Sequence, residues 1–101
     1  MEESLDGLVK ALCADYARRE RLLRQGVLSR RAECELRYIN AKITDAALEI
    51  CDIKDIDIFI TDIGASVGYC KSDIDYMSEK TYKKKKLEIK SNIAKKLYLV
   101  N

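Results

Sequence analysis

A run of lysines near the C-terminus is the part of this sequence best suited to chemistry. Lys83 to Lys86 follow Ser78 and Thr81, which both carry a hydroxyl group. Lysine ammonium groups bind phosphates as compact point charges. Hydroxyls and free backbone N–H groups at a helix start can donate hydrogen bonds to phosphate oxygens. This combination indicates contact with a nucleic-acid backbone.

Helix geometry limits how many of these lysines can act together. Four successive residues spread over about 400° around a helix, so the run cannot face one way. Lys86 comes four residues after Tyr82 and is expected beside the apolar face, with its ammonium group reaching water. The candidates for nucleic-acid contact are Ser78, Lys80, Thr81, Lys83, Lys84 and Lys90. The alternative is that these residues form an ordinary solvated helix face.

Charge is distributed unevenly along the 101 residues, although the net charge is only +2. Residues 45–75 hold two lysines and eight acidic residues, and residues 76–101 hold eight lysines and two glutamates. This segregation permits a basic binding face, and it equally permits attraction between the two segments. A second basic group flanks the first expected turn: Arg18, Arg19, Arg21, Arg24, Arg30 and Arg31.

The residue types argue against catalysis. The chain has no histidine, so the commonest general acid–base residue is missing. The four cysteines are far apart and form no CxxC pair, which argues against zinc: Cys13, Cys34, Cys51 and Cys70. The aspartates of residues 52–75 lack the glycine and glutamate of a calcium loop. We therefore expect a non-enzymatic protein without a cofactor or metal ion.

The sequence also predicts a cytoplasmic protein that does not bind membranes. It contains no run of about eighteen uncharged apolar residues. The first ten residues, MEESLDGLVK, are acidic and lack the basic start and long apolar run of a signal peptide.

The elements that would position these residues are expected to be helices in a single domain, residues 1–101. The chain has no proline and only four glycines, which favours an all-α bundle of about four helices. Helices are predicted over 4–25, 29–51 and 78–98, capped by Ser4, Ser29 and Ser78, with Gly26 ending the first. Their expected apolar stripes are Leu5, Leu8, Leu12, Tyr16 and Leu23, then Leu36, Ile39, Ile43, Ala46, Ala47 and Ile50, and finally Tyr82, Ile89, Ile93, Leu97 and Val100.

Residues 53–63 fit two structures. Alternating isoleucines favour a strand, whereas Ile53, Ile56, Ile60, Ile63 and Val67 form a helical stripe that Asp52 or Asp55 could cap. We favour the helix, because no second strand is evident to pair with this one. Residues 64–68, GASVG, are expected to end or distort that helix rather than to serve a close helix contact.

The segment SEKTYKKKKLEIKSNIAKKL, residues 78–97, resembles the recognition-helix end of sigma-region-4-like helix-turn-helix proteins. The matching residues are Ser78, Thr81, Tyr82, the lysines, Ile93, Ala94 and Leu97. The resemblance implies a helix-turn-helix-like C-terminal half in a transcription regulator of a phage or mobile element. It also implies DNA contacts by Ser78, Lys80, Thr81, Lys83 and Lys84.

Two functions follow from these patterns. The first is a regulatory protein that binds DNA, with the first two helices forming the seam of a homodimer. The alternative is a phage-type interaction module that binds and inhibits a host protein, such as an immune nuclease of the CRISPR type. Its interface would comprise Asp73, Asp75, Tyr76 and Met77, because tyrosine and complementary charge suit protein interfaces.

Overall fold

The computed structural model describes residues 3–97, and in this range every regular element is a helix. The α-helices are α1 (Glu3–Ala14), α2 (Tyr16–Gln25), α3 (Arg30–Leu48), α4 (Ile56–Ala65) and α5 (Glu79–Lys96), and two short 3₁₀ helices are η1 (Ile53–Asp55) and η2 (Tyr69–Lys71). The expected all-α class is confirmed, as is the helical prediction for residues 53–63. None of the described helices is long and apolar enough to span a membrane.

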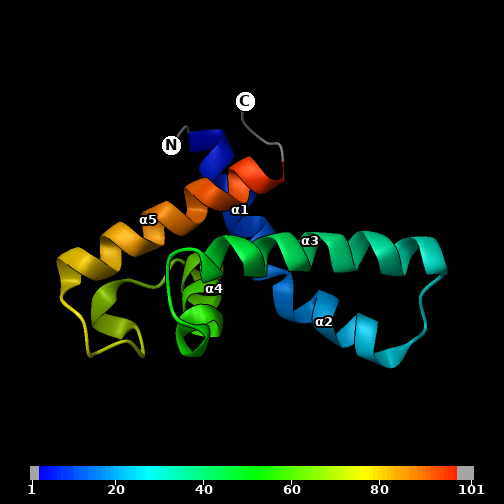
Figure 1. Ribbon diagram of the computed structural model, residues 1–101, viewed down its shortest axis with the longest axis horizontal. Coiled ribbons are helices and arrows are strands. Elements are labelled where there is room, and N and C mark those ends of the chain that lie inside the picture. Colours follow the sequence, from blue (N-terminus) through cyan, green and yellow to red (C-terminus); the bar gives the residue numbers. More distant parts are fainter. Residues whose placement is uncertain (1–2, 98–101) are drawn as a thin grey trace.

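The single helix expected over residues 4–25 is wrong, because the chain bends at Asp15 and forms α1 and α2 (Figure 1). Ser4 lies inside α1 and not at its cap. The predicted stripe is also rotated, since Leu8 is exposed while Val9 and Cys13 are buried. The bend lets α1 pack against α4 and α5 while α2 runs beside α3. The two halves of residues 4–25 therefore pack against different helices, whereas one straight helix would present a single apolar face.

A buried arginine holds this bend together. Arg19 donates from Nε to Asn40 Oδ1 at 2.6 Å and from Nη2 to the carbonyl of Leu12. Asn40 in turn donates to Glu20 Oε1 at 2.9 Å and to the Tyr16 carbonyl at 3.2 Å. The Leu12 carbonyl lies in the last turn of α1, where the helix dipole is negative and favours a cation. Burial lowers the pKa of Arg19, but a guanidinium remains charged at ordinary pH.

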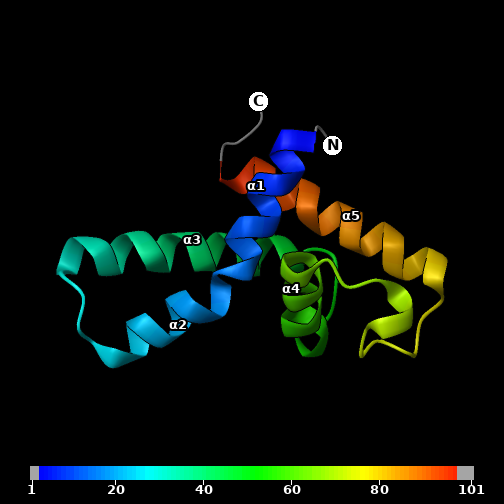
Figure 2. The ribbon, with the colours of Figure 1, turned by 180° about the vertical axis from the view of Figure 1, so that it is seen from behind.

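Helix α2 ends and helix α3 begins at the residues that the sequence predicts. The Ser29 hydroxyl accepts a hydrogen bond from the Ala32 N–H at 3.2 Å. Gly26 ends α2 in the left-handed region, with φ of 68°. The outer part of the α2–α3 hairpin, around the turn, extends away from the other helices, as both ribbon views show (Figures 1 and 2).

The core lies where α1, α4 and α5 pack together on the C-terminal half of α3. Phe59 and Tyr82 stack in it with ring centroids 5.4 Å apart. The buried apolar residues are Val9, Cys13, Ile43, Ala46, Ala47, Cys51, Ile56, Phe59, Ile60, Ile63, Ile74, Tyr82, Ile89, Ile93 and Ala94. The stripes predicted for α3, α4 and α5 are therefore largely correct. Ile53 is an exception because it is exposed, and Val100 lies outside the described residues.

Helices α1 and α4 approach each other closely at Gly64. A Cβ atom at this position would lie 2.6 Å from the backbone nitrogen of Ala14 and 2.8 Å from its Cα. The expectation that residues 64–68 only end the helix was incomplete. They do end it, since Ser66 adopts a left-handed conformation with φ of 56°, but Gly64 also forms a tight contact.

The connection between α4 and α5 comprises residues 66–78 and contains η2. A helix-turn-helix motif joins its two helices by three or four residues. The tight turn that the resemblance implies is thus replaced by a long connection. Ile74 anchors this connection in the core, where it is almost fully buried.

Replacing Gly64 with alanine is expected to lower the free energy of unfolding by about 2 kcal/mol, because two backbones must separate to admit the methyl group. Gly7→Ala is the matched control, since Gly7 is also helical and a Cβ atom added there would meet no neighbouring atom within 4 Å. That change should stabilise the protein by roughly 0.5–1 kcal/mol through helix propensity. Urea denaturation measures both, and a stabilising Gly64→Ala would contradict the close packing.

Candidate nucleic-acid interface

The predicted interface begins at the N-terminus of α5, where Ser78 is the cap. The Ser78 hydroxyl accepts from the Thr81 N–H at 3.2 Å and lies 2.9 Å from the Thr81 hydroxyl oxygen. The prediction that Ser78 caps the helix is confirmed. The two hydroxyls bind each other, and the Ser78 hydroxyl also caps the helix. In this geometry both groups therefore stabilise the start of α5.

Three of the predicted lysines point outward from the first half of α5. Lys80, Lys83 and Lys84 are exposed. Lys83 forms an exposed ion pair with Glu79 at 3.1 Å, which contributes little to stability. Lys80 and Lys84 form no ion pair with any residue of the described range 3–97. They are one helical turn apart, about 6 Å along the axis, and so form a two-lysine site.

Lys90 does not belong to this outward face, contrary to the sequence prediction. Its side chain is only 15% exposed, and its Nζ lies 3.1 Å from Asp6 Oδ1 of α1. The hydrogen bond from Lys90 lowers the pKa of Asp6. Lys90 therefore joins α5 to α1, and its charge is compensated within the fold.

Two further lysines of α5 also serve the fold. Lys86 Nζ donates to the Val67 carbonyl at 2.6 Å and lies 5.7 Å from the Tyr82 ring centroid. Burial, followed by repulsion from Lys90, lowers the pKa of Lys86. Lys96 pairs with Glu49 at 2.8 Å. The prediction that Lys86 lies beside the apolar face is confirmed, but its ammonium group, expected to reach water, instead binds the Val67 carbonyl and is partly buried.

A buried carboxylate positions the start of α5 and the connection before it. Asp62 Oδ2 accepts hydrogen bonds from Ser72 Oγ at 2.6 Å and from the Tyr82 hydroxyl at 2.8 Å. The Tyr82 hydroxyl also reaches the Val67 carbonyl, at 3.3 Å. Asp62 thus joins α4, the connection and α5 through one side chain. Nothing in the local sequence pattern distinguishes Asp62 from the exposed aspartates near it.

The residues of the alternative interface lie on the same connection. Asp73 and Asp75 are exposed, and Met77 is half-buried, with its carbonyl accepting from the Tyr69 hydroxyl. Tyr76 is 53% exposed. Its hydroxyl donates to the buried Asp55, and Lys54 Nζ lies 4.8 Å from its ring centroid. The Tyr76 ring is therefore held in one orientation at the surface.

One exposed residue of the outward face was not predicted. Leu87 is 57% exposed and lies three residues after Lys84 and seven after Lys80. The spacing 80–84–87 places these three side chains on one side of α5. Helical spacing could have identified Leu87, but the residue types expected to contact phosphate are all polar.

No family model, no curated protein and no solved structure matches this chain. In the described residues, no three histidine, cysteine, aspartate or glutamate side chains are grouped so that they could hold a metal ion.

The contact between Tyr82 and Asp62 has a measurable pH dependence. Burial, together with the hydrogen bond to Asp62, raises the pKa of Tyr82 from its usual value of 10.0 to about 12. The unfolded chain then loses the Tyr82 proton before the folded chain does. The stabilisation from this raised pKa is complete below about pH 10 and is lost between about pH 10 and 12.

We expect the wild type to lose stability relative to Tyr82→Phe across this interval, because phenylalanine has no proton to lose. Urea denaturation of both proteins at a series of pH values measures the difference. A constant difference from pH 9 to 12 would show that Tyr82 titrates normally in the folded protein.

Proposed function

We propose that this chain is a small non-enzymatic regulatory protein that binds a nucleic-acid duplex through the first half of α5. The observation that carries the proposal is that some lysines of this helix bind other parts of the fold whereas others do not. Lys86, Lys90 and Lys96 have partners within the fold, whereas Lys80 and Lys84 point outward without one in residues 3–97.

The proposed contact is with phosphates and not with bases. Lysine binds phosphate through charge, and phosphate contacts carry no sequence information directly. Asp73 and Asp75 are exposed on the connection immediately before α5. Their carboxylates disfavour deep entry of this end of the helix into a groove that phosphates flank. A homodimer would present two such faces to one duplex, which is how many regulators use a two-fold axis.

The proposal can be tested by fluorescence anisotropy with a labelled duplex DNA across a salt series. Each neutralised phosphate contributes about 0.9 to the slope of log affinity against log salt. The double variant Lys80→Ala/Lys84→Ala is therefore expected to reduce the slope by about 1.8 and to weaken binding at low salt. Circular dichroism should show unchanged helicity, because both side chains are exposed.

Lys95→Ala is the matched control, since Lys95 is an exposed lysine at the opposite end of α5. It should leave the slope nearly unchanged if the contact is local. No binding by the wild type at low salt would end the proposal. Equal effects per lysine removed, that is, a control effect of about half that of the double variant, would indicate general charge attraction instead of a defined contact.

The orientation of Tyr76 favours a second candidate function, the binding of a host protein. A half-exposed tyrosine whose ring is already ordered loses little side-chain entropy on binding, and such residues often dominate interfaces. Asp73 and Asp75 would give this interface a preference for a basic partner. A host protein that is retained by the wild type and by the Lys80→Ala/Lys84→Ala variant, but not by Tyr76→Ala, would support this candidate.

A further inference from the structure

The outer part of the α2–α3 hairpin lacks a buried side chain. No residue from 20 to 39 is buried. This segment nevertheless contains seven large apolar residues: Leu22, Leu23, Val27, Leu28, Leu36, Tyr38 and Ile39. Val27, at the turn, is 72% exposed. Two helices alone cannot cover their own apolar faces, and stable domains bury them against a further layer.

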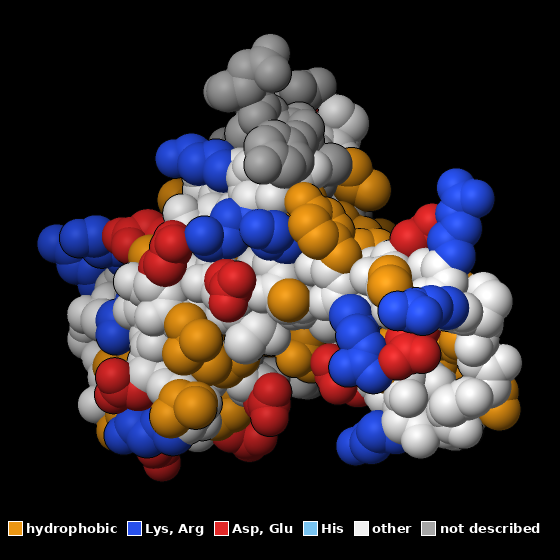
Figure 3. Space-filling model, turned by 45° about the vertical axis from the view of Figure 1, so that its right-hand side comes forward, with side chains coloured by type: hydrophobic (Ala, Val, Ile, Leu, Met, Phe, Trp, Pro, Cys, Tyr) orange, Lys and Arg blue, Asp and Glu red, His pale blue; other side chains and the backbone are white. Residues whose placement is uncertain are grey.

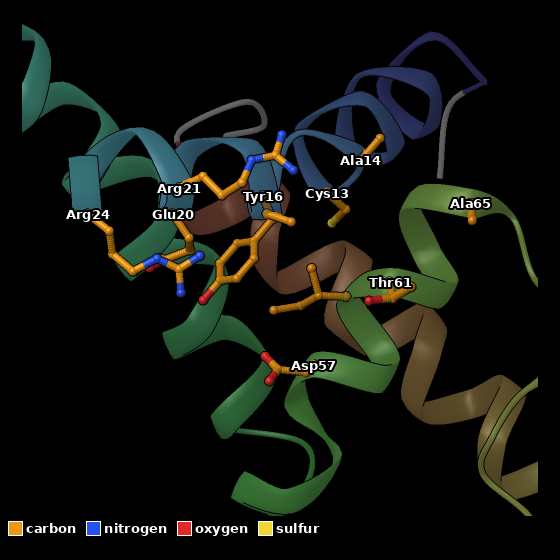
Figure 4. Close-up of a pocket in the computed structure, with 11 residues that line it drawn as sticks. Cys13, Ala14, Tyr16, Glu20, Arg21, Arg24, Asp57, Thr61 and Ala65 are labelled. Carbon is orange, nitrogen blue, oxygen red and sulfur yellow. The ribbon is translucent and has the colours of Figure 1, made fainter. Parts of the chain in front are cut away.

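A groove of about 640 Å³ lies between this hairpin and α4 (Figure 4). Helix α2 provides Arg21 and Arg24 on one wall, and α4 provides Asp57 and Thr61 on the other. Tyr16 lies between the two walls. Arg21, Arg24 and Asp57 have no ion-pair partner in the described part of the chain. Glu20 also lies on the α2 wall, which therefore carries a net charge of +1 (two arginines and one glutamate), whereas Asp57 gives the α4 wall a charge of −1.

We infer that a second copy of this chain occupies the groove, related to the first by a two-fold axis. In such a contact, the same surface of both copies takes part, and each wall of the groove faces the opposite wall of the other copy. A groove with opposite charges on its two walls is complementary to itself under that operation. Arg21 and Arg24 of each copy then face Asp57 of the other.

The same axis brings together the two most exposed large apolar residues of the described chain. Val27 ends the hairpin, and Ile53, which is 80% exposed, lies beside the start of α4. Helices α2 and α4 extend on the same side of α3 in both ribbon views (Figures 1 and 2), and Figure 3 shows a hollow at the lower edge of the molecule. A two-fold axis between them places the hairpin of each copy on α4 of the other.

A direct pairing of hairpin with hairpin is less favourable. Residues 20–39 carry five arginines and three glutamates. Two such segments side by side would bring net positive charge together, whereas the reciprocal arrangement sets arginine against aspartate. Charge therefore selects α4 as the surface that covers the hairpin.

This inference does not depend on the proposed function, because the outward lysines of α5 do not line the groove. Dimerisation and nucleic-acid binding can therefore succeed or fail separately.

The test is sedimentation equilibrium of the purified protein over a concentration series. The wild type is expected to reach twice the mass of one chain. Arg21→Asp and Asp57→Arg should each raise the dissociation constant by at least about tenfold, since each creates like charges across the contact. The double variant Arg21→Asp/Asp57→Arg should restore dimerisation, because it exchanges the charges of the two walls. Arg21 is preferred to Arg24, whose charge also favours the C-terminal end of α2.

Lys95→Asp is the control for Arg21→Asp, because it makes the same change in net charge on an exposed residue outside the groove. It should leave the dissociation constant unchanged. Circular dichroism confirms that each variant is folded. A wild type that is monomeric at every concentration would overturn the inference, as would a folded double variant that remains monomeric.

Discussion

The burial of one carboxylate, that of Asp62, determines how the second half of this protein is assembled. A buried charge is costly unless hydrogen bonds replace its lost hydration. Ser72 and Tyr82 supply two such bonds, from the connection and from α5. These donors belong to different segments, so satisfying Asp62 requires that both segments lie against α4. The orientation of α5, and with it the direction of its outward lysines, follows from this requirement.

A second buried charge has the corresponding role in the first half. Arg19 is compensated by the Leu12 carbonyl and by the Asn40 side chain, and not by a carboxylate in direct contact. Removing either partner of a buried charge is strongly destabilising, even though burying the charge gives little net stability. The two charges therefore specify the arrangement of the helices, while the apolar core supplies most of the free energy of folding.

The sequence predicts those features of the fold that depend on neighbours in the chain. Ser29 and Ser78 can be recognised as caps because a cap bonds to a residue three positions away. Lys86 is placed correctly by helical spacing alone. The bend at Asp15 and the roles of Asp62 and Lys90 were missed. Lys90 and Lys80 are the same residue type on the same helix, but they point about 80° apart around its axis, and only Lys90 lies beside Asp6, which is distant in sequence.

The packing of α1 has a consequence for the order of folding. Its main partners are α4 and α5, which both follow it in the chain. During synthesis, α1 is made before them, so the surface that buries Val9 and Cys13 does not exist until those helices have emerged. Because contacts between distant segments must overcome a large loop entropy, their formation slows folding. The apolar side of α1 therefore remains open to other molecules until α4 and α5 have been synthesised.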